Sequence, residues 1–147
     1  MNNECDRRLA RALLVIRLVL GLFLLQWTIE KFIDTEGMTS IFDYFYGIEI
    51  GLSSAQIIGG VELVLVTAFL AGAYKNIVYP LFLLFNAVSV GSTWKQLIDP
   101  YASSNHLFTA GIPLVATTWL LWYLRDRDIL FCWDEKRRRE RASDGGE

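Results

Sequence analysis

Four apolar blocks dominate this chain, and each is close to the length that a helix needs to cross a bilayer, about 20 residues. They span residues 13–33, 54–73, 77–94 and 106–124. Hydrophobic residues make up 53% of the 147 positions, and a soluble domain would alternate them with polar residues around one core. Irregular backbone exposed to lipid is too costly within a membrane. The blocks therefore predict an all-α fold, an integral membrane four-helix bundle that occupies residues 1–133.

The first block begins like a secretory signal peptide, because Arg7, Arg8 and Arg11 precede it. Its apolar core is longer than that of a typical signal peptide, and no small-residue cleavage pattern follows it. We therefore interpret this block as a retained helix.

The distribution of basic residues predicts how the helices are oriented. Lys31 and Lys95 flank one side of the predicted bundle, and Arg17 lies within the first block. All other basic residues flank the opposite side: Arg7, Arg8, Arg11, Lys75, Arg125, Arg127, Lys136, Arg137, Arg138, Arg139 and Arg141. The positive-inside rule places this side, and with it both termini, in the cytoplasm. The chain is then a multi-pass protein of the inner or plasma membrane.

Residues 134–147 form a charged tail that contains the run KRRRER. Such a run can bind nucleic acid. After a membrane helix it is more often a topology anchor that contacts anionic lipid. We therefore predict a disordered tail, a lipid bilayer as its partner, and no nucleic-acid partner.

Two connections shape the predicted bundle. Residues 34–56 are rich in aromatic side chains and too short to span, which favours a short interfacial helix near residues 40–46 that lies as a lid over the outer ends. A tight turn at residues 74–76 predicts that the second and third helices are antiparallel neighbours. Pro113 predicts a kink inside the fourth helix.

Glu62 is the one ionisable residue of the second block. A lone carboxylate in a spanning helix costs about 2.5–3.5 kcal/mol, so it requires a partner, a proton or a water-filled cavity. Arg17 either reaches this carboxylate or extends toward cytoplasmic headgroups. Asn86, in the middle of the third block, is a second candidate partner for Glu62.

A second polar group is expected near the outer end of the bundle. It contains Gln26, Trp27, Glu30, Lys31, Trp94, Lys95, Asn105 and His106. His106 is the only histidine, so it either moves protons near neutral pH or is simply a helix-start residue that faces water. The cysteines, Cys5 and Cys132, both fall on the reducing side, and no metal-ligand pattern or CxxC motif is present.

The stretches RLVLGLFLLQWTIEKFI and GGVELVLVTAFLAGAY resemble the DoxX family of small four-helix membrane proteins. That family typically has an arginine early in helix one, a lysine at its end and a glutamate in a second helix rich in small residues, which here correspond to Arg17, Lys31 and Glu62. The resemblance covers the first three helices, and the fourth only by hydropathy. It implies a layout similar to the DoxD subunit of thiosulfate:quinone oxidoreductase, and to a more distant receptor-assembly chaperone.

Three functions remain open from the sequence. The first is a quinone-associated component of a redox or oxidative-stress pathway, in which Glu62, Lys31 and His106 bond the quinone or pass protons and Trp27 and Trp94 stack on its ring. Gln26, Glu30, Lys95, Arg17 and Asn86 complete the candidate ligand-binding residues. No cofactor site of its own is evident, so electrons would come from a partner protein. The second is an assembly factor that binds client helices. The third is a small-solute or ion pathway, which requires a homo-oligomer.

Overall fold

The computed structural model describes residues 3–144 and is all-α, with 81% of the chain helical and no strand in the described part. The elements are α1 (Asn3–Ile33), α2 (Thr35–Tyr46), α3 (Leu52–Leu70), α4 (Lys75–Ser92), α5 (Trp94–Ile98), the 3₁₀-helix η1 (Asn105–Ala110), α6 (Gly111–Tyr123) and α7 (Trp133–Asp144). The all-α prediction is confirmed.

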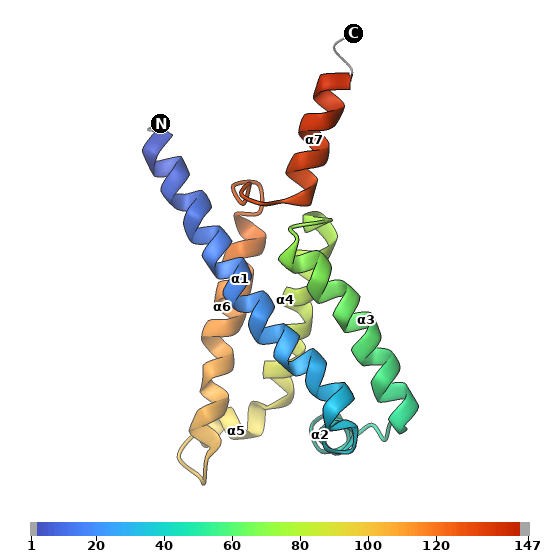
Figure 1. Ribbon diagram of the computed structural model, residues 1–147. Coiled ribbons are helices and arrows are strands. Elements are labelled where there is room, and N and C mark those ends of the chain that lie inside the picture. Colours follow the sequence, from blue (N-terminus) through green and yellow to red (C-terminus); the bar gives the residue numbers. More distant parts are fainter. Residues whose placement is uncertain (1–2, 145–147) are drawn as a thin grey trace.

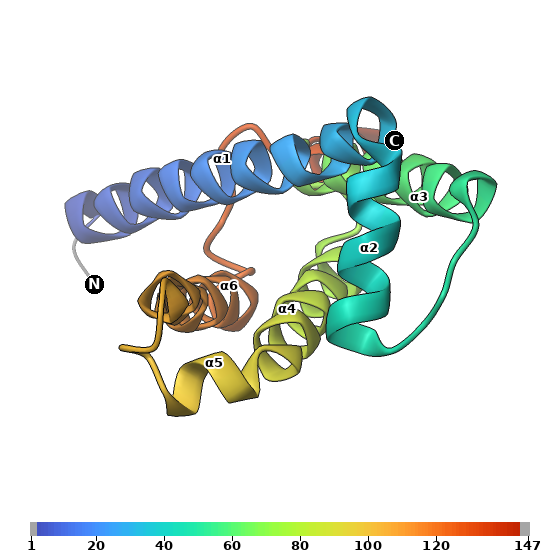
Figure 2. The same ribbon diagram turned by 90° about the horizontal axis from the view of Figure 1, so that it is seen from below.

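Four of these helices form the body of the molecule in two pairs. α1 packs along α3 and α4 packs along α6, as Figure 1 and Figure 2 show. The predicted neighbours α3 and α4 touch near their tight turn and then diverge, so the main partner of α3 is α1. Apolar side chains from all four helices form the core: Leu13, Leu20, Val66, Phe69, Val78, Tyr79, Phe82 and Leu121.

Among residues 3–144, two helices are long and apolar enough to cross a membrane. They are Glu4–Ile33, in which a window of 18 residues has a mean hydropathy of 2.1, and Leu52–Leu70, in which such a window has a mean hydropathy of 1.6. α6 alone has 13 residues, but η1 runs directly into it. A 3₁₀-helix rises about 2.0 Å per residue and an α-helix about 1.5 Å, so the two together extend roughly 30 Å.

The predicted fourth helix, 106–124, therefore differs in its first part, which is 3₁₀ rather than α-helical. Pro113 is the third residue of α6 and not an interior residue, because the α-helix begins at Gly111. A missing N–H in the first turn leaves no hydrogen bond unmade. The expected mid-helix kink is wrong for this reason. The third predicted helix, 77–94, also divides, since α4 ends at Ser92 and α5 begins at Trp94.

α2 lies crosswise at one end of the bundle (Figure 2). It begins five residues before the predicted 40–46 segment because the Asp34 side chain caps it by accepting the Gly37 N–H at 3.0 Å. Met38 is its buried residue. At its far end the Phe45 ring lies 5.8 Å from that of Phe108 in η1. The helix thus connects α1 with the α4–α6 pair at this end.

Both ends of the chain are more helical than the sequence predicts. α1 begins at Asn3 rather than near residue 13, with Glu4 and Asp6 in its first turn, where carboxylates interact favourably with the helix dipole. The expected disorder of residues 134–147 is wrong as far as Asp144, because α7 extends to that residue. Ion pairs between Glu135 and the arginines three and four residues later support this exposed helix. Residues 145–147 lie outside the described part.

Candidate functional site

Arg17 is the centre of a buried polar network at the end of the bundle opposite α2. Its side chain is 0% exposed. Its Nη1 donates to Asp128 Oδ2 at 2.7 Å and also to the Cys132 sulfur. The Tyr79 hydroxyl donates to the same Asp128 oxygen. Three segments that are far apart in the sequence, α1, α4 and the chain after α6, therefore meet at one ion pair.

The segment of residues 124–132, which we call the strap, covers this network. Arg17 Nη2 donates to the carbonyl oxygens of Leu130 and Phe131, at 2.7 and 3.1 Å. Lys75 Nζ donates to the carbonyl oxygens of Arg125 and Asp128, at 3.0 and 2.7 Å. Two cations thus satisfy four carbonyls of an irregular segment, which explains why the strap can lie folded against the helices without secondary structure of its own.

The strap holds its position at a cost in backbone strain. Phe131 has φ 49°, in the left-handed region that a bulky side chain rarely adopts. This conformation directs its carbonyl at Arg17, and the residue is 86% exposed. Opposite the strap, Gly72 has φ 59°, and a Cβ there would lie 2.7 Å from Arg17 Nη1 and 2.8 Å from Cys132 Sγ. Only glycine fits at this position.

Two buried atoms of the network have no hydrogen-bond partner, Arg17 Nε and Asp128 Oδ1. An unsatisfied polar atom in a buried charge pair carries a desolvation cost. The network therefore depends strongly on the contacts that it does make.

Of the two alternatives for Arg17, the pairing with Glu62 is wrong. Arg17 turns toward the strap, and Glu62 Oε2 instead forms an ion pair with Lys31 Nζ at 2.8 Å. The Lys31 and Glu62 side chains are 9% and 27% exposed. Gly59 makes the pair possible, because a Cβ there would lie only 3.1 Å from Lys31 Cβ, so the α1 and α3 backbones approach closely at this level. The sequence identified both residues but not their partnership.

The predicted outer cluster is not one site, because its residues lie on different surfaces. Gln26 and Glu30 line an open groove of about 470 Å³ along α1, together with Leu22, Leu25, Ile29, Ile33 and Asp34. At about 100° per residue, Lys31 lies about 160° around the helix from Ile29. The groove and the Lys31–Glu62 pair therefore face in different directions.

The remaining predicted residues also lie apart from the Lys31–Glu62 pair. Trp27 is exposed, with its ring edge against Phe23. Trp94 and Lys95 are exposed on α5, where Lys95 Nζ lies 5.8 Å from the Trp94 ring centre. His106 is exposed in η1, as the interpretation of a water-facing helix-start residue predicts. Lys31 Nζ has a long contact, 3.4 Å, to the backbone carbonyl of Trp27, and no other described contact joins these residues to Lys31 or Glu62.

Asn86 is buried but does not contact Glu62. Its Nδ2 donates to Thr118 Oγ1 at 3.1 Å, so it connects α4 to α6. The prediction failed because α4 packs on α6 rather than along α3. This hydrogen bond joins the two helices of the second pair, as the Lys31–Glu62 ion pair joins those of the first.

Sequence reasoning missed Asp128, Tyr79 and the strap carbonyls. A signal for Asp128 was present. Arg17 lies in the first third of the first block, and Asp126 and Asp128 follow the fourth block at the same end of the predicted bundle. A search for carboxylates at the depth of Arg17 would have considered them before Glu62. Nothing in the sequence indicates that the strap folds back over α1.

Burial within the network raises the pKa of the Cys132 thiol, and the nearby Asp128 carboxylate raises it further. The thiolate is the reactive form, so we expect Cys132 to alkylate at least about tenfold more slowly than the exposed Cys5 at about pH 8. Mass spectrometry after brief treatment with N-ethylmaleimide measures both rates in one sample. Equal rates in the folded protein would contradict the burial of Cys132, and unfolding the protein should remove the difference.

Among residues 3–144, no group of three or more His, Cys, Asp or Glu side chains is arranged to hold a metal ion. Comparison with known protein families, curated proteins and solved structures found no match. The assignment of function therefore depends on the geometry of the polar pairs and on the apolar surface around them.

Proposed function

We propose that this chain is an integral membrane protein in which α1, α3, α4 and the η1–α6 unit cross the bilayer, with both termini in the cytoplasm. The proposal is supported by the two long apolar helices and by large apolar side chains exposed along all four crossing segments. They include Val19, Ile33, Val64, Ile77, Leu84, Val88, Ile112 and Trp119. Water would leave this apolar surface unfavourably solvated, whereas lipid would cover it.

The proposed topology has a direct test by cysteine labelling in intact cells, in a Cys5→Ser background. A cysteine at Ser103, between α5 and η1, is expected to react with a membrane-impermeant maleimide. A cysteine at Ser143, in α7, is expected to react only after the membrane is permeabilised. Labelling of both positions in intact cells, or of Ser143→Cys alone, would contradict the orientation.

For a membrane protein of this topology we propose a quinone-associated role, as the DoxX resemblance implies. The protein would act with a partner protein in a redox or oxidative-stress pathway. The observation that carries it is the Lys31–Glu62 ion pair between two apolar helices. The ammonium group has three N–H donors, of which one faces Glu62 and a second has only a long contact, 3.4 Å, to the Trp27 carbonyl. A donor thus remains for a carbonyl oxygen.

Lys31 and Glu62 fit a quinone head, and the other predicted residues do not join them. Lys31 would donate to a quinone carbonyl, and the partly exposed Glu62 would hold or release a proton beside it. A bound quinone supplies the redox chemistry. The proposed quinone site does not include His106 of η1 or Trp94 and Lys95 of α5.

Direct binding of a short-chain quinone to the purified protein tests this role. We expect the double variant Lys31→Gln/Glu62→Gln to weaken binding at least about tenfold, because it removes the charged donor and the proton site together. Replacing both partners avoids leaving a buried charge unpaired, as Glu62→Gln alone would.

Thr118→Val is the matched control, since it removes the buried Asn86–Thr118 hydrogen bond of the other helix pair and leaves Lys31 and Glu62 intact. Its quinone affinity is expected to stay within about a factor of two. Unchanged binding in the double variant, or equal losses in the two variants, would exclude this site for the quinone.

A second candidate function, an assembly factor that binds client helices, is favoured by open small-residue positions. A Cβ added at Gly60 on α3 or at Gly91 on α4 would meet nothing within 4 Å, so a foreign helix could approach these backbones closely. Native mass spectrometry of gently extracted protein separates the two functions. A bound quinone supports the first, and a stoichiometric protein partner on an otherwise empty bundle supports the second.

A further inference from the structure

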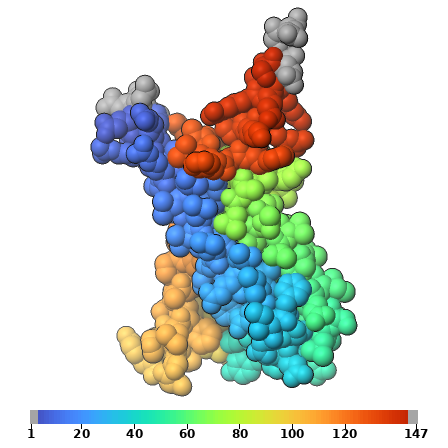
Figure 3. Space-filling model, in the orientation of Figure 1, coloured from blue at the N-terminus to red at the C-terminus, as the bar shows by residue number. Residues whose placement is uncertain are grey.

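Two helical segments project from the same end of the molecule, the end at which the strap lies. They are residues 3–12 of α1 and the whole of α7, and we call them together the basic fork. Figure 3 shows them as two separate projections with the strap between their bases. Arg127 of the strap forms an ion pair with Asp6 of the first projection, at 3.0 Å.

α7 is fixed at its base rather than loosely attached. The Trp133 N–H donates to the Ala71 carbonyl at 2.9 Å. The Asp134 carboxylate accepts the Tyr74 and Lys75 N–H groups, at 2.8 and 2.9 Å, and so caps the start of α4. These contacts fix the orientation of α7 relative to the bundle, so its exposed side chains have defined positions relative to the rest of the molecule.

Four carboxylates of the fork form ion pairs, whereas a set of its arginines does not. Glu4 pairs with Arg8, Asp6 with Arg127, Glu135 with Arg138 and Arg139, and Glu140 with Lys136. In the described residues no ion pair involves four exposed arginines, Arg7, Arg11, Arg137 and Arg141.

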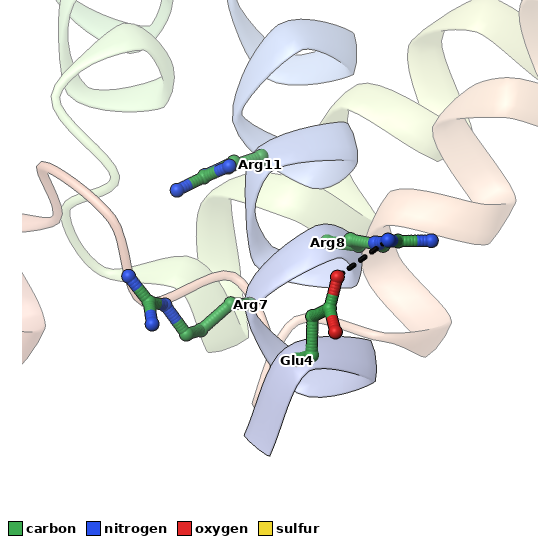
Figure 4. A pocket seen from close by; sticks show the side chains of 4 residues that line it. All are labelled: Glu4, Arg7, Arg8 and Arg11. Atoms are coloured by element: carbon green, nitrogen blue, oxygen red, sulfur yellow. Dashed lines mark hydrogen bonds and ion pairs between the residues drawn. The ribbon is translucent and has the colours of Figure 1, made fainter. Parts of the chain in front are cut away.

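These four arginines form one pair on each projection. Arg7 and Arg11, and likewise Arg137 and Arg141, are four residues apart and share a helix face. Figure 4 shows the first pair beside a hollow of about 440 Å³ that Glu4 and Arg8 also line.

We propose that the basic fork is a docking surface for a water-soluble protein with an acidic face, which the four unpaired arginines bind through carboxylates. Arginine matches carboxylate geometry with two parallel hydrogen bonds. Because the two pairs lie on separate projections, one ligand that contacts both must extend across the strap between them (Figure 3), which fits a folded protein better than a small anion.

Two features favour a protein over a lipid or nucleic-acid ligand. Between Lys136 and Ser143 every residue of α7 is exposed and Ala142 is the only apolar one, so the helix lacks the apolar face with which interfacial helices lie on a membrane. Acidic residues are interspersed with the basic ones along α7. The closely spaced phosphates of a nucleic acid would be repelled by these carboxylates, whereas an acidic polypeptide can place its carboxylates at the arginines and its uncharged backbone at these positions.

This inference rests on the proposed membrane topology, because both projections must face one aqueous compartment. It does not depend on quinone binding. The labelling of Ser103→Cys and Ser143→Cys tests the topology independently, so failure of the fork and failure of the topology are distinguishable.

The test uses the full chain in nanodiscs of neutral phosphatidylcholine, with fluorescent poly-glutamate as the acidic probe at low ionic strength. We expect Arg7→Gln/Arg11→Gln/Arg137→Gln/Arg141→Gln to weaken binding at least about tenfold, because four exposed charge pairs of modest strength are lost together. The matched control is Arg8→Gln/Arg127→Gln/Arg138→Gln/Arg139→Gln. It removes the same number of charges, but from arginines that are already paired, so its affinity for poly-glutamate should fall by less than about threefold.

Three results would overturn the docking surface. Equal losses of poly-glutamate affinity in the two variants would show that binding depends on net charge alone. Tighter binding of polyuridylate than of poly-glutamate would assign the arginines to nucleic acid. Absence of poly-glutamate binding by the unmodified protein would also reject the proposal. In that case, phosphatidylglycerol adducts that appear in native mass spectra of the unmodified protein, and disappear when the four unpaired arginines are replaced, would assign these arginines to lipid.

Discussion

Replacing Arg17 with methionine is expected to lower the free energy of unfolding by about 3–5 kcal/mol, the cost of leaving one member of a buried ion pair without its partner. The variant leaves the fully buried Asp128 carboxylate with only the Tyr79 hydroxyl as a donor from the network side chains. It also frees the carbonyls of Leu130 and Phe131, so the strap should detach from α1. Urea unfolding in detergent micelles measures the loss.

The double variant Arg17→Met/Asp128→Asn should recover part of this loss, because it removes the uncompensated charge. If Arg17→Met does not fold, Asp128→Asn alone and the double variant still give the comparison, and the double variant must be the more stable of the two.

The control is the Arg127–Asp6 pair, which also joins α1 to the strap but has side chains 50% and 39% exposed. Arg127→Met is expected to cost no more than about 1 kcal/mol, as exposed pairs do. Similar losses for Arg17→Met and Arg127→Met would show that burial is not what makes the Arg17 pair important.

Gly72→Ala is expected to destabilise the protein by about 3 kcal/mol, from a left-handed backbone conformation and from overpacking together. Its φ is 59°, and the added Cβ would meet Arg17 Nη1 and Cys132 Sγ at 2.7 and 2.8 Å. Neither atom can move away freely, because Arg17 is held by Asp128 and two strap carbonyls. Thermal unfolding monitored by circular dichroism measures the change.

Gly60→Ala is the control for this substitution. Gly60 lies within α3, and a Cβ there meets nothing within 4 Å. Alanine is the better helix former by about 1 kcal/mol, so this variant should be neutral or slightly more stable. Gly72→Ala should also speed the alkylation of Cys132, since the two sites are in contact. The described packing of the strap would be contradicted if the Gly72→Ala protein were as stable as the unmodified protein and its Cys132 were still alkylated slowly.

The sequence determined those features that depend on local composition. Apolar blocks of membrane-spanning length predicted an all-α chain, and the lone carboxylate of the second block marked Glu62 as a residue that needs a partner. The short helix across the bundle end was also predictable, because an aromatic segment too short to span follows the first block. The capping residue Asp34 shows why that helix begins earlier than expected.

The tertiary structure alone decided which polar residues meet. Whether Glu62 pairs with Arg17, Asn86 or Lys31 depends on how the helices are paired and on how each is rotated about its own axis. Because α1 packs on α3 and α4 on α6, Lys31 meets Glu62 and Asn86 meets Thr118. Asp128 reaches Arg17 only because an irregular strap folds back against α1, and irregular segments carry no periodic pattern from which their path could be read.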